Sequence, residues 1–290
     1  MWGSDRFIMQ MGRETLLRRP DSPVIADERA PVMNARETLL AVRAVGIRFG
    51  GIVALDAVSF DLQRGHILGL IGPNGAGKTT LFNCITRLYT LDTGEILFEG
   101  RNILGDAAHK IAPRGIARTF QNLALFRRMS VLDNIRVGGH AQSRGDFVSD
   151  SLRLPWTRRH REALDARVWA LIDALDLRAV AHRTVTDLAT GTQKRVEIAR
   201  ALAAAPKLLL LDEPAAGLNH NEVAELGCLI RQVRDDHDIT VLLVEHHMNL
   251  VMSISDKVVA LDFGRKIADG TPNEVREDPE VIRAYLGGAQ

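Results

Sequence analysis

The sequence HILGLIGPNGAGKTT, from His66 to Thr80, gives the strongest indication of the fold. Its first part, His66 to Ile71, is short and nearly all apolar, which is typical of a strand buried on both faces of a parallel sheet. The second part has the P-loop spacing: glycine, four residues, glycine, lysine and threonine. The glycines let the backbone curl so that N–H groups face inward, and a helix opening at about Lys78 points its positive end at the same spot. The stretch therefore predicts a strand, a phosphate-binding loop and a helix in succession.

Each part of this loop has an expected chemical role. Lys78 is expected to reach the β- and γ-phosphates as a point charge, and the Thr79 hydroxyl to ligate Mg²⁺. Thr80 is a candidate for a further phosphate contact. The pattern predicts a bound triphosphate with Mg²⁺, and the nucleotide-binding residues that it predicts are Gly72, Pro73, Asn74, Gly75, Ala76, Gly77, Lys78, Thr79 and Thr80.

Two carboxylates, Asp212 and Glu213, follow a second apolar run, Leu208 to Leu211. Ligands of open parallel sheets bind at the carboxyl ends of the strands. Asp212 is expected to hold the Mg²⁺ shell, and Glu213 to orient and partly deprotonate the attacking water. A strand that ends in Asp-Glu is by itself as often the start of a solvated loop, so the P-loop upstream is what favours the catalytic interpretation.

The remaining strand-like segments predict two sheets. Leu39 to Val45 and Ile52 to Phe60 predict an antiparallel layer on the N-terminal side. Thr240 to Val244 predicts another core strand, and the last strands are expected at Lys257 to Leu261 and Arg265 to Ala268, before C-terminal helices. The fold class is therefore α/β, a P-loop NTPase core with a mostly parallel sheet and an antiparallel β-subdomain.

Helical periodicity appears in two places. Residues from about 122 to 187 repeat apolar side chains at helical spacing, which predicts an α-helical subdomain inserted into the core. A helix is also expected to begin at Gln193 and to end before Pro206. The expected domain therefore covers 38–290, with its α/β core at 38–121 and 188–290. Residues 1–37 have no sustained period, which predicts a solvated extension in which Met33 is an alternative first residue.

Composition narrows the function classes. The chain has 37 Lys and Arg against 36 Asp and Glu, a formal charge of +1, so it lacks the basic field of a protein that binds nucleic acid. Cys84 and Cys228 form no paired framework, which favours a reducing compartment. No apolar stretch approaches the ~20 residues of a membrane-spanning helix, and the N-terminus lacks the apolar run of a signal peptide. These features predict a cytoplasmic protein.

These residues and their order resemble the nucleotide-binding subunits of ABC transporters over about residues 39–288. The resemblance implies ATP as the nucleotide and further roles for single residues. Gln121 resembles the glutamine that touches Mg²⁺ or water and senses the membrane partner; a surface amide is the alternative. His246 resembles the switch histidine that contacts the γ-phosphate. Phe49 resembles the aromatic residue that stacks on adenine, with a core phenylalanine as the alternative.

The adjacent histidines at 246 and 247 and the segment 216–219 each allow a second interpretation. His246 and His247 are adjacent, and on an extended chain adjacent side chains point opposite ways, which disfavours a metal site. The segment 216–219 resembles the D-loop of the family's dimer interface. Asn219 with Glu222 also predicts a capping box at the start of the next helix.

The family's signature loop, Leu-Ser-x-Gly-Gln, departs from its pattern here. The matching residues are Leu188, Ala189, Thr190, Gly191 and Thr192. In the family this loop closes over the ATP of the opposite subunit, so Ala189 removes a hydroxyl donor where an anion binds. Helix amides remain available, and slowing of about ten- to a hundredfold is expected from one lost hydrogen bond to a charged group.

Finer matches at 115–122, 213–219 and 267–287 resemble the subunits of branched-chain amino-acid importers. The resemblance implies integral membrane permeases as partners, a second ATPase in a heterodimer or homodimer, and a periplasmic or surface solute-binding protein acting indirectly. It places the chain at the cytoplasmic face of the inner membrane and implies no nucleic-acid partner. Alternatives are a urea, amide or other amino-acid importer, a lipopolysaccharide exporter, a weakly hydrolysing regulator, and an ABC protein acting on ribosomes or DNA.

Overall fold

A computed structural model describes residues 38–119, 124–140 and 155–286. Residues 34–290 form one compact unit. The predicted extension, residues 1–37, and Gln121 lie outside the described residues.

The N-terminal layer is an antiparallel sheet of four strands in the order β2-β1-β4-β5. It consists of β1 (Thr38–Phe49), β2 (Ile52–Gln63), β4 (Thr93–Phe98) and β5 (Arg101–Asn102). The turn between β1 and β2 uses Gly50 at φ 59°, a conformation that glycine adopts without steric cost. The predicted antiparallel β-subdomain is confirmed.

The core sheet has six strands in the order β10-β9-β3-β8-β7-β6. All neighbours in it are parallel except the antiparallel pair β9 and β10. The mostly parallel sheet predicted from the buried apolar runs is therefore confirmed. Its strands are β3 (Ile67–Ile71), β6 (Ile116–Arg118), β7 (Leu208–Asp212), β8 (Thr240–Val244), β9 (Lys257–Asp262) and β10 (Arg265–Gly270).

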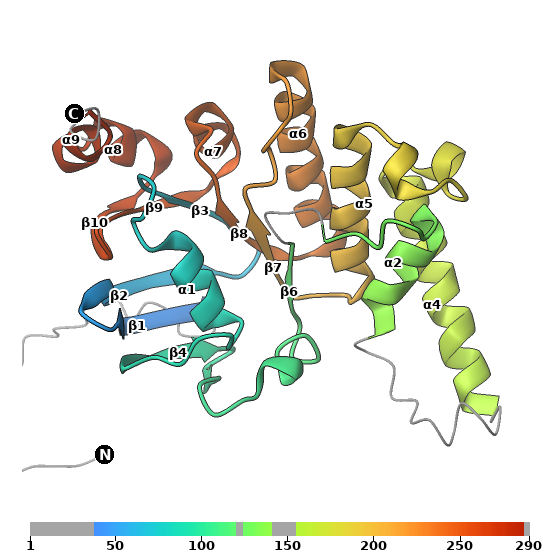
Figure 1. Cartoon of the computed structure of the whole chain (residues 1–290), viewed down its shortest axis with the longest axis horizontal. Coiled ribbons are helices and arrows are strands. Elements are labelled where there is room, and N and C mark those ends of the chain that lie inside the picture. The colour runs from blue at the N-terminus through green and yellow to red at the C-terminus, as the bar shows by residue number, and fades with distance from the viewer. Residues whose placement is uncertain (1–37, 120–123, 141–154, 287–290) are drawn as a thin grey trace, which may run out of the picture. The chain divides into compact units, whose positions relative to one another are not determined.

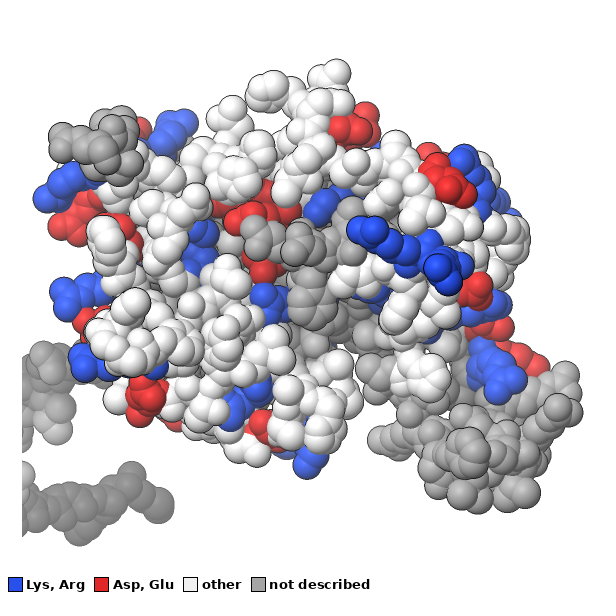
Figure 2. Space-filling view, in the orientation of Figure 1, with Lys and Arg blue, Asp and Glu red and all other residues white. Residues whose placement is uncertain are grey.

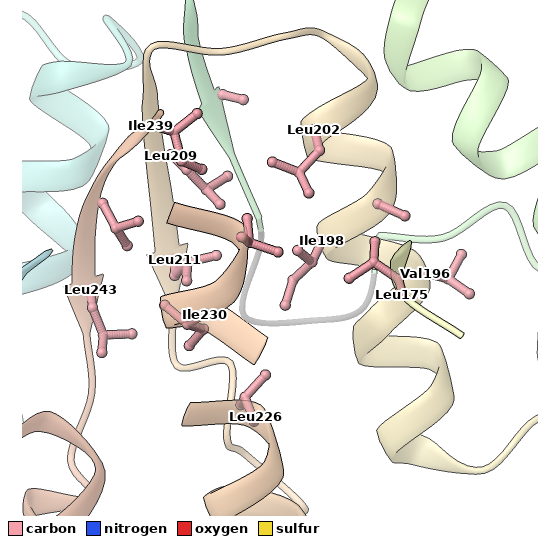
Figure 3. Close-up of a cluster of buried hydrophobic side chains, with 14 of the residues drawn as sticks. Leu175, Val196, Ile198, Leu202, Leu209, Leu211, Leu226, Ile230, Ile239 and Leu243 are labelled. Carbon is pink, nitrogen blue, oxygen red and sulfur yellow. The ribbon is translucent and has the colours of Figure 1, made fainter. Parts of the chain in front are cut away.

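The core sheet is covered on both faces, which explains why its strands are continuous apolar runs. On β7, Leu209 and Leu211 join a cluster with the helices on one face, as Figure 3 shows, whereas Leu208 and Leu210 join a second cluster with α1 and the antiparallel sheet. Figure 1 shows these layers. The helices involved are α1 (Lys78–Ile85), α5 (Thr190–Ala203), α6 (His220–His237), α7 (Met248–Ile254), α8 (Pro272–Glu277) and α9 (Pro279–Leu286).

The predicted helical insertion lies between β6 and β7 and contains α2 (Val131–Gly139) and α4 (Pro155–Ala174). Along α4, Val168, Leu171 and Ile172 are buried in the core cluster, as the apolar stripe predicts. Single 3₁₀ turns span Ala108–Lys110, Arg178–Val180 and Val185–Asp187.

One helix boundary differs from the sequence prediction. The helix expected to begin at Gln193 begins at Thr190, because Gln193 already donates its N–H to the Ala189 carbonyl. Thr190, Gly191 and Thr192 therefore form the first turn of α5.

Of the helices that the structure describes, none combines the length and apolar character needed to cross a bilayer. On the face in Figure 2, positive and negative side chains are interspersed among the described residues.

Candidate nucleotide site

Three catalytic candidates leave the core sheet at one edge. Asp212 on β7 pairs in register with Val244 on β8, and Val244 pairs with Leu70 on β3. All three strands are parallel, so the segments that follow them emerge together. The P-loop after β3, Glu213 after β7 and His246 after β8 therefore lie at the same edge.

The P-loop needs glycine at both of its ends. Gly77 has φ 100°, and a Cβ there would lie 2.6 Å from the Ala54 carbonyl oxygen. A Cβ on Gly72 would lie 2.2 Å from the Leu261 carbonyl oxygen. Any larger residue would displace backbone at these two points, which explains the glycines of the motif in physical terms.

Lys78 is buried, with only 8% of its surface exposed. Its Nζ donates to the carbonyl oxygens of Gly72, at 2.6 Å, and Pro73, at 2.9 Å. Burial lowers the pKa of the Lys78 amine, and the charges of Glu213 and Asp212 oppose this shift. The amine thus faces the loop that a phosphate would enter, within the field of both carboxylates. The other loop residues are close by in sequence, with Thr79 exposed and Thr80 half-buried at the start of α1.

Asp212 is only 2% exposed, and its two carboxylate oxygens have different surroundings. Oδ2 accepts a hydrogen bond of 2.8 Å from Nη2 of Arg118, which also donates through Nη1 to Asn83. Oδ1 is buried and has no hydrogen-bond partner among the described residues. A buried carboxylate oxygen without a partner is costly, and it is the kind of donor that Mg²⁺ takes. The residues present therefore fit a magnesium ion. Arg118 was not predicted as a site residue.

Glu213 follows β7 in a left-handed conformation, with φ 48°. Such a φ is uncommon for a residue with a Cβ and persists only where neighbouring structure holds it. Its N–H donates to the Val244 carbonyl at 2.9 Å, and its carbonyl accepts from Ala216 at 3.2 Å. The strand edge therefore fixes the backbone from which the Glu213 side chain projects.

The prediction that the His246 and His247 side chains point opposite ways is wrong. Their ring centroids are 4.5 Å apart, because the extended chain ends at Val244 and His247 is already the N-cap of α7. With Glu245 they bring ligand atoms to within 4.8 Å of one another. However, the buried Glu245 carboxylate already accepts three backbone N–H groups, from Ala215, His246 and His247. Glu245 was not predicted as functional, although a charged residue directly after an apolar strand was a signal for it.

Phe49 lies at the end of β1 and is 46% exposed, so it is not a core phenylalanine. Its ring packs edge-on against Tyr89 with centroids 5.1 Å apart. An exposed aromatic face supported from the side is suited to stacking on a flat ring.

The signature loop is in a different place from the P-loop edge. Ala189 is exposed and is the N-cap of α5, with no side-chain hydrogen bond, and the Gln193 side chain donates back to the Leu188 carbonyl at 2.8 Å. The loop borders its own cavity of about 240 Å³, which is shared with α6.

At the start of α6 the predicted capping box between Asn219 and Glu222 is confirmed.

The sequence patterns also did not predict a hydrogen bond between the P-loop and the C-terminal helix α9. Tyr285 on α9 accepts a hydrogen bond of 2.8 Å from the Gly72 N–H, so the first P-loop residue is held by the last helix. Burial raises the pKa of the Tyr285 phenol to about 12. The two residues are 213 positions apart, and no local pattern connects them.

Comparisons with known proteins agree with this geometry. Residues 55–216 match the profile of the ABC transporter family, and residues 265–290 match that of the branched-chain amino acid ATP-binding cassette transporter. Among similar proteins, the chain is 46% identical over 255 residues to the high-affinity branched-chain amino acid transport ATP-binding protein LivG of Salmonella typhimurium, covering 87% of this chain and 99% of that protein. It is 44% identical over 253 residues to the corresponding protein BraF of Pseudomonas aeruginosa, covering 87% and 98%.

Solved structures give the same answer. The ADP conformation of an ATP-binding cassette of an ABC transporter matches with a TM-score of 0.75 and 29% identity, covering 86% of this chain and 99% of that one. A nucleotide-free cassette matches with a TM-score of 0.74 and 28% identity, covering 86% and 98%. The chain therefore belongs to the ABC transporter family and is one of its ATP-hydrolysing cassettes.

Proposed function

We propose that this chain powers the import of branched-chain amino acids by binding and hydrolysing ATP. Its relatives LivG and BraF carry that transport role in their names, at 44–46% identity over nearly their whole length. The observation that carries the proposal for ATP turnover is the buried Asp212 Oδ1, which has no partner among the described residues. It belongs to a carboxylate whose charge, with that of Glu213, raises the pKa of Lys78 against the effect of burial.

In this proposal the P-loop holds the triphosphate. Its inward N–H groups bind phosphate oxygens, and Lys78 exchanges the carbonyls of Gly72 and Pro73 for the β- and γ-phosphates. Phe49 stacks on the adenine. Asp212, Thr79 and Gln121 would hold Mg²⁺, which when bound neutralises charge that develops on the phosphate oxygens.

Hydrolysis is assigned to the residues that follow β7 and β8. Glu213 orients the attacking water and accepts its proton, and His246 contacts the γ-phosphate from the neighbouring strand. His246 is suited to this because 53% of its side chain is exposed at the sheet edge. Gln121, which lies outside the described residues, is assigned to the water or Mg²⁺ and to sensing the membrane partner.

The permease subunits are proposed to dock on an apolar groove beside β6. This cavity, of about 460 Å³, is lined mainly by apolar side chains, including Leu88, Ile111 and Phe126. Leu88 is 56% exposed and Phe126 50%, and exposed apolar clusters of this kind mark interaction sites. Docking there would place the chain, as a peripheral subunit, at the cytoplasmic face of the inner membrane, with a solute-binding protein acting on the other side.

A second ATPase is proposed as the partner that completes each nucleotide site. Ala189, Gly191 and Thr192 of the segment 188–192 line a cavity that no P-loop residue lines, which supports the action of this segment on the partner's ATP. Since Ala189 provides no hydroxyl, the partner's nucleotide meets the weaker loop. A heterodimer then has one stronger and one weaker site.

Hydrolysis is tested by phosphate release from the wild type and from Glu213→Gln. We expect the variant to bind ATP but to turn it over at least about a hundredfold more slowly, because general-base catalysis contributes that much. Glu225→Gln, an exposed carboxylate on α6, is the matched control and should keep the wild-type rate. Equal rates for Glu213→Gln and the wild type would favour the weakly hydrolysing regulator.

The transported solute requires the assembled complex. We expect the chain, reconstituted with its permeases and binding protein in vesicles, to support ATP-dependent uptake of labelled leucine over labelled urea. Uptake of urea alone, or export of lipopolysaccharide, would replace the branched-chain assignment but keep the ATPase.

A further inference from the structure

The Glu245 carboxylate lies between two catalytic turns and is completely buried, with 0% of its surface exposed. A carboxylate that is removed from water needs partners for its charge. Here the partners are backbone amides. Oε1 accepts from the Ala215 N–H at 2.8 Å, and Oε2 accepts from the N–H groups of His246, at 2.9 Å, and His247, at 3.1 Å.

These hydrogen bonds connect the segment after β7 with the segment after β8. Ala215 lies two residues beyond Glu213, and His246 directly follows Glu245. A second link runs in parallel, because the Glu213 N–H donates to the Val244 carbonyl at 2.9 Å. Two hydrogen bonds, one at Glu213 itself and one at Ala215, therefore join the left-handed turn at Glu213 to the segment that contains His246.

We propose that Glu245 is a positioning residue that holds Glu213 and His246 in a fixed relation, so that contact with the γ-phosphate and activation of water occur in one geometry. The proposal rests on the roles assigned to those two residues above. It also explains why Glu245, His246 and His247 form a hydrogen-bonded turn and not a metal site: both carboxylate oxygens of Glu245 already accept backbone hydrogen bonds.

The chemistry of the position favours a carboxylate over an amide. The three groups that hydrogen-bond to it are all backbone donors, and an ionised carboxylate is a pure acceptor on both oxygens. The Nδ1 atom of His246 also lies 3.7 Å from Oε2. Glutamine would place an NH₂ donor opposite either the Ala215 N–H or the N–H groups of the two histidines. One of the two turns would then lose its hydrogen bonds to residue 245. Aspartate keeps the charge but is one methylene shorter, so it can serve only one of the two turns well.

The test is steady-state hydrolysis by the full chain carrying Glu245→Gln, together with the Kd for ATP. We expect kcat to fall about ten- to a hundredfold, the effect of a lost hydrogen bond to a charged group. The Kd for ATP should change less than about threefold, because the P-loop is a separate segment, and this also reports that the variant is folded. Glu245→Asp should recover part of kcat.

Two comparisons separate positioning from a general structural effect. Combined with His246→Ala, Glu245→Gln should add little further loss, because both changes disable the same unit. Glu274→Gln is the matched control, since Glu274 also accepts a backbone N–H, from Thr271, but at the start of α8. It should keep the wild-type kcat.

Several results would overturn the proposal. An unchanged kcat in Glu245→Gln, a fully additive loss with His246→Ala, or a parallel loss of kcat and ATP affinity would each reject positioning while leaving the ATPase in place. A wild-type chain without hydrolysis would instead reject the proposed function and this inference with it.

Discussion

In the proposed function, the P-loop edge of the core sheet and the signature loop at the start of α5 both bind phosphate through backbone amides, but their side chains are held differently. At the sheet edge, Lys78 and Asp212 are buried and tied to Gly72, Pro73 and Arg118. At the loop, the N-cap Ala189 is exposed and has no side-chain hydrogen bond. In the proposed function, the groups for this chain's own ATP are therefore held in a preorganised site, whereas the loop relies on helix amides and the helix dipole.

This contrast implies that the P-loop edge and the signature loop can vary independently. Gly191 of the signature loop and Glu222 of α6 line one cavity, and a Cβ added to Gly191 would lie 3.2 Å from the Glu222 Oε1. No P-loop residue lines that cavity. A change at Ala189 therefore leaves the buried site intact. In the proposed heterodimer this separates binding of this chain's ATP from closure over its partner's ATP.

The largest expected effect is on the P-loop side. Lys78→Met should raise the Kd of the chain for ATP by about a hundredfold, because the ammonium supplies charge-assisted hydrogen bonds to phosphate. Titration with a fluorescent ATP analogue measures it.

Lys110→Met, an exposed lysine in the 3₁₀ turn after β5, is the control and should bind ATP normally. A Lys78→Met chain with wild-type affinity for ATP would show that the P-loop is not the phosphate site. The contrast between a preorganised P-loop site and the signature loop would then be wrong.

Much of the P-loop edge was predictable because its elements carry local signals. The glycine spacing marks the loop, and apolar runs that end in Ile71, Leu211 and Val244 mark strands whose carboxyl ends meet at one edge. The capping box at Asn219 was also predictable, since both of its residues lie within one turn.

What was missed depends on long-range neighbours or on where an element ends. Arg118 and Asp212 are 94 positions apart, and periodicity does not report which residues meet across a sheet. The start of α5 was placed three residues late because threonine and glycine are weak helix formers, so the pattern showed the helix only from Gln193. The His246 and His247 rings were expected to diverge because the turn into α7 was not anticipated.

The next effect tests the signature loop. Reverting Ala189→Ser together with Thr192→Gln should raise ATP turnover of the complex with the second ATPase by about tenfold, because a lost donor to the partner's phosphate is restored. Phosphate release from the reconstituted complex measures it. Binding of ATP to the isolated variant chain should stay at the wild-type level, and an unchanged turnover would remove the idea of a weakened loop.

A smaller effect is expected at the rim of the P-loop site. Phe49→Ala should raise the Kd for ATP about fivefold, the lower end for base stacking on an aromatic residue, because Phe49 is half-exposed. The loss should shrink for triphosphate without a base. Phe126→Ala removes a phenyl ring of similar exposure in the proposed permease groove, and it should leave ATP affinity unchanged but weaken assembly with the permeases.

The smallest effect is on stability and concerns the signature loop alone. Ala189→Ser places a hydroxyl at an N-cap with extended backbone, φ −61° and ψ 152°, where it can accept an N–H of the first turn of α5. We expect the free energy of unfolding to rise by about 1 kcal/mol in urea titrations. Ala107→Ser makes the same change at a matching backbone, φ −74° and ψ 149°, before a 3₁₀ helix of three residues, and should gain less because few amides follow it. Equal gains in stability at both positions would mean that the missing N-cap does not specifically destabilise the start of α5. Any gain in turnover on reverting Ala189 would then be assigned to contact with the phosphate and not to a more stable helix N-terminus.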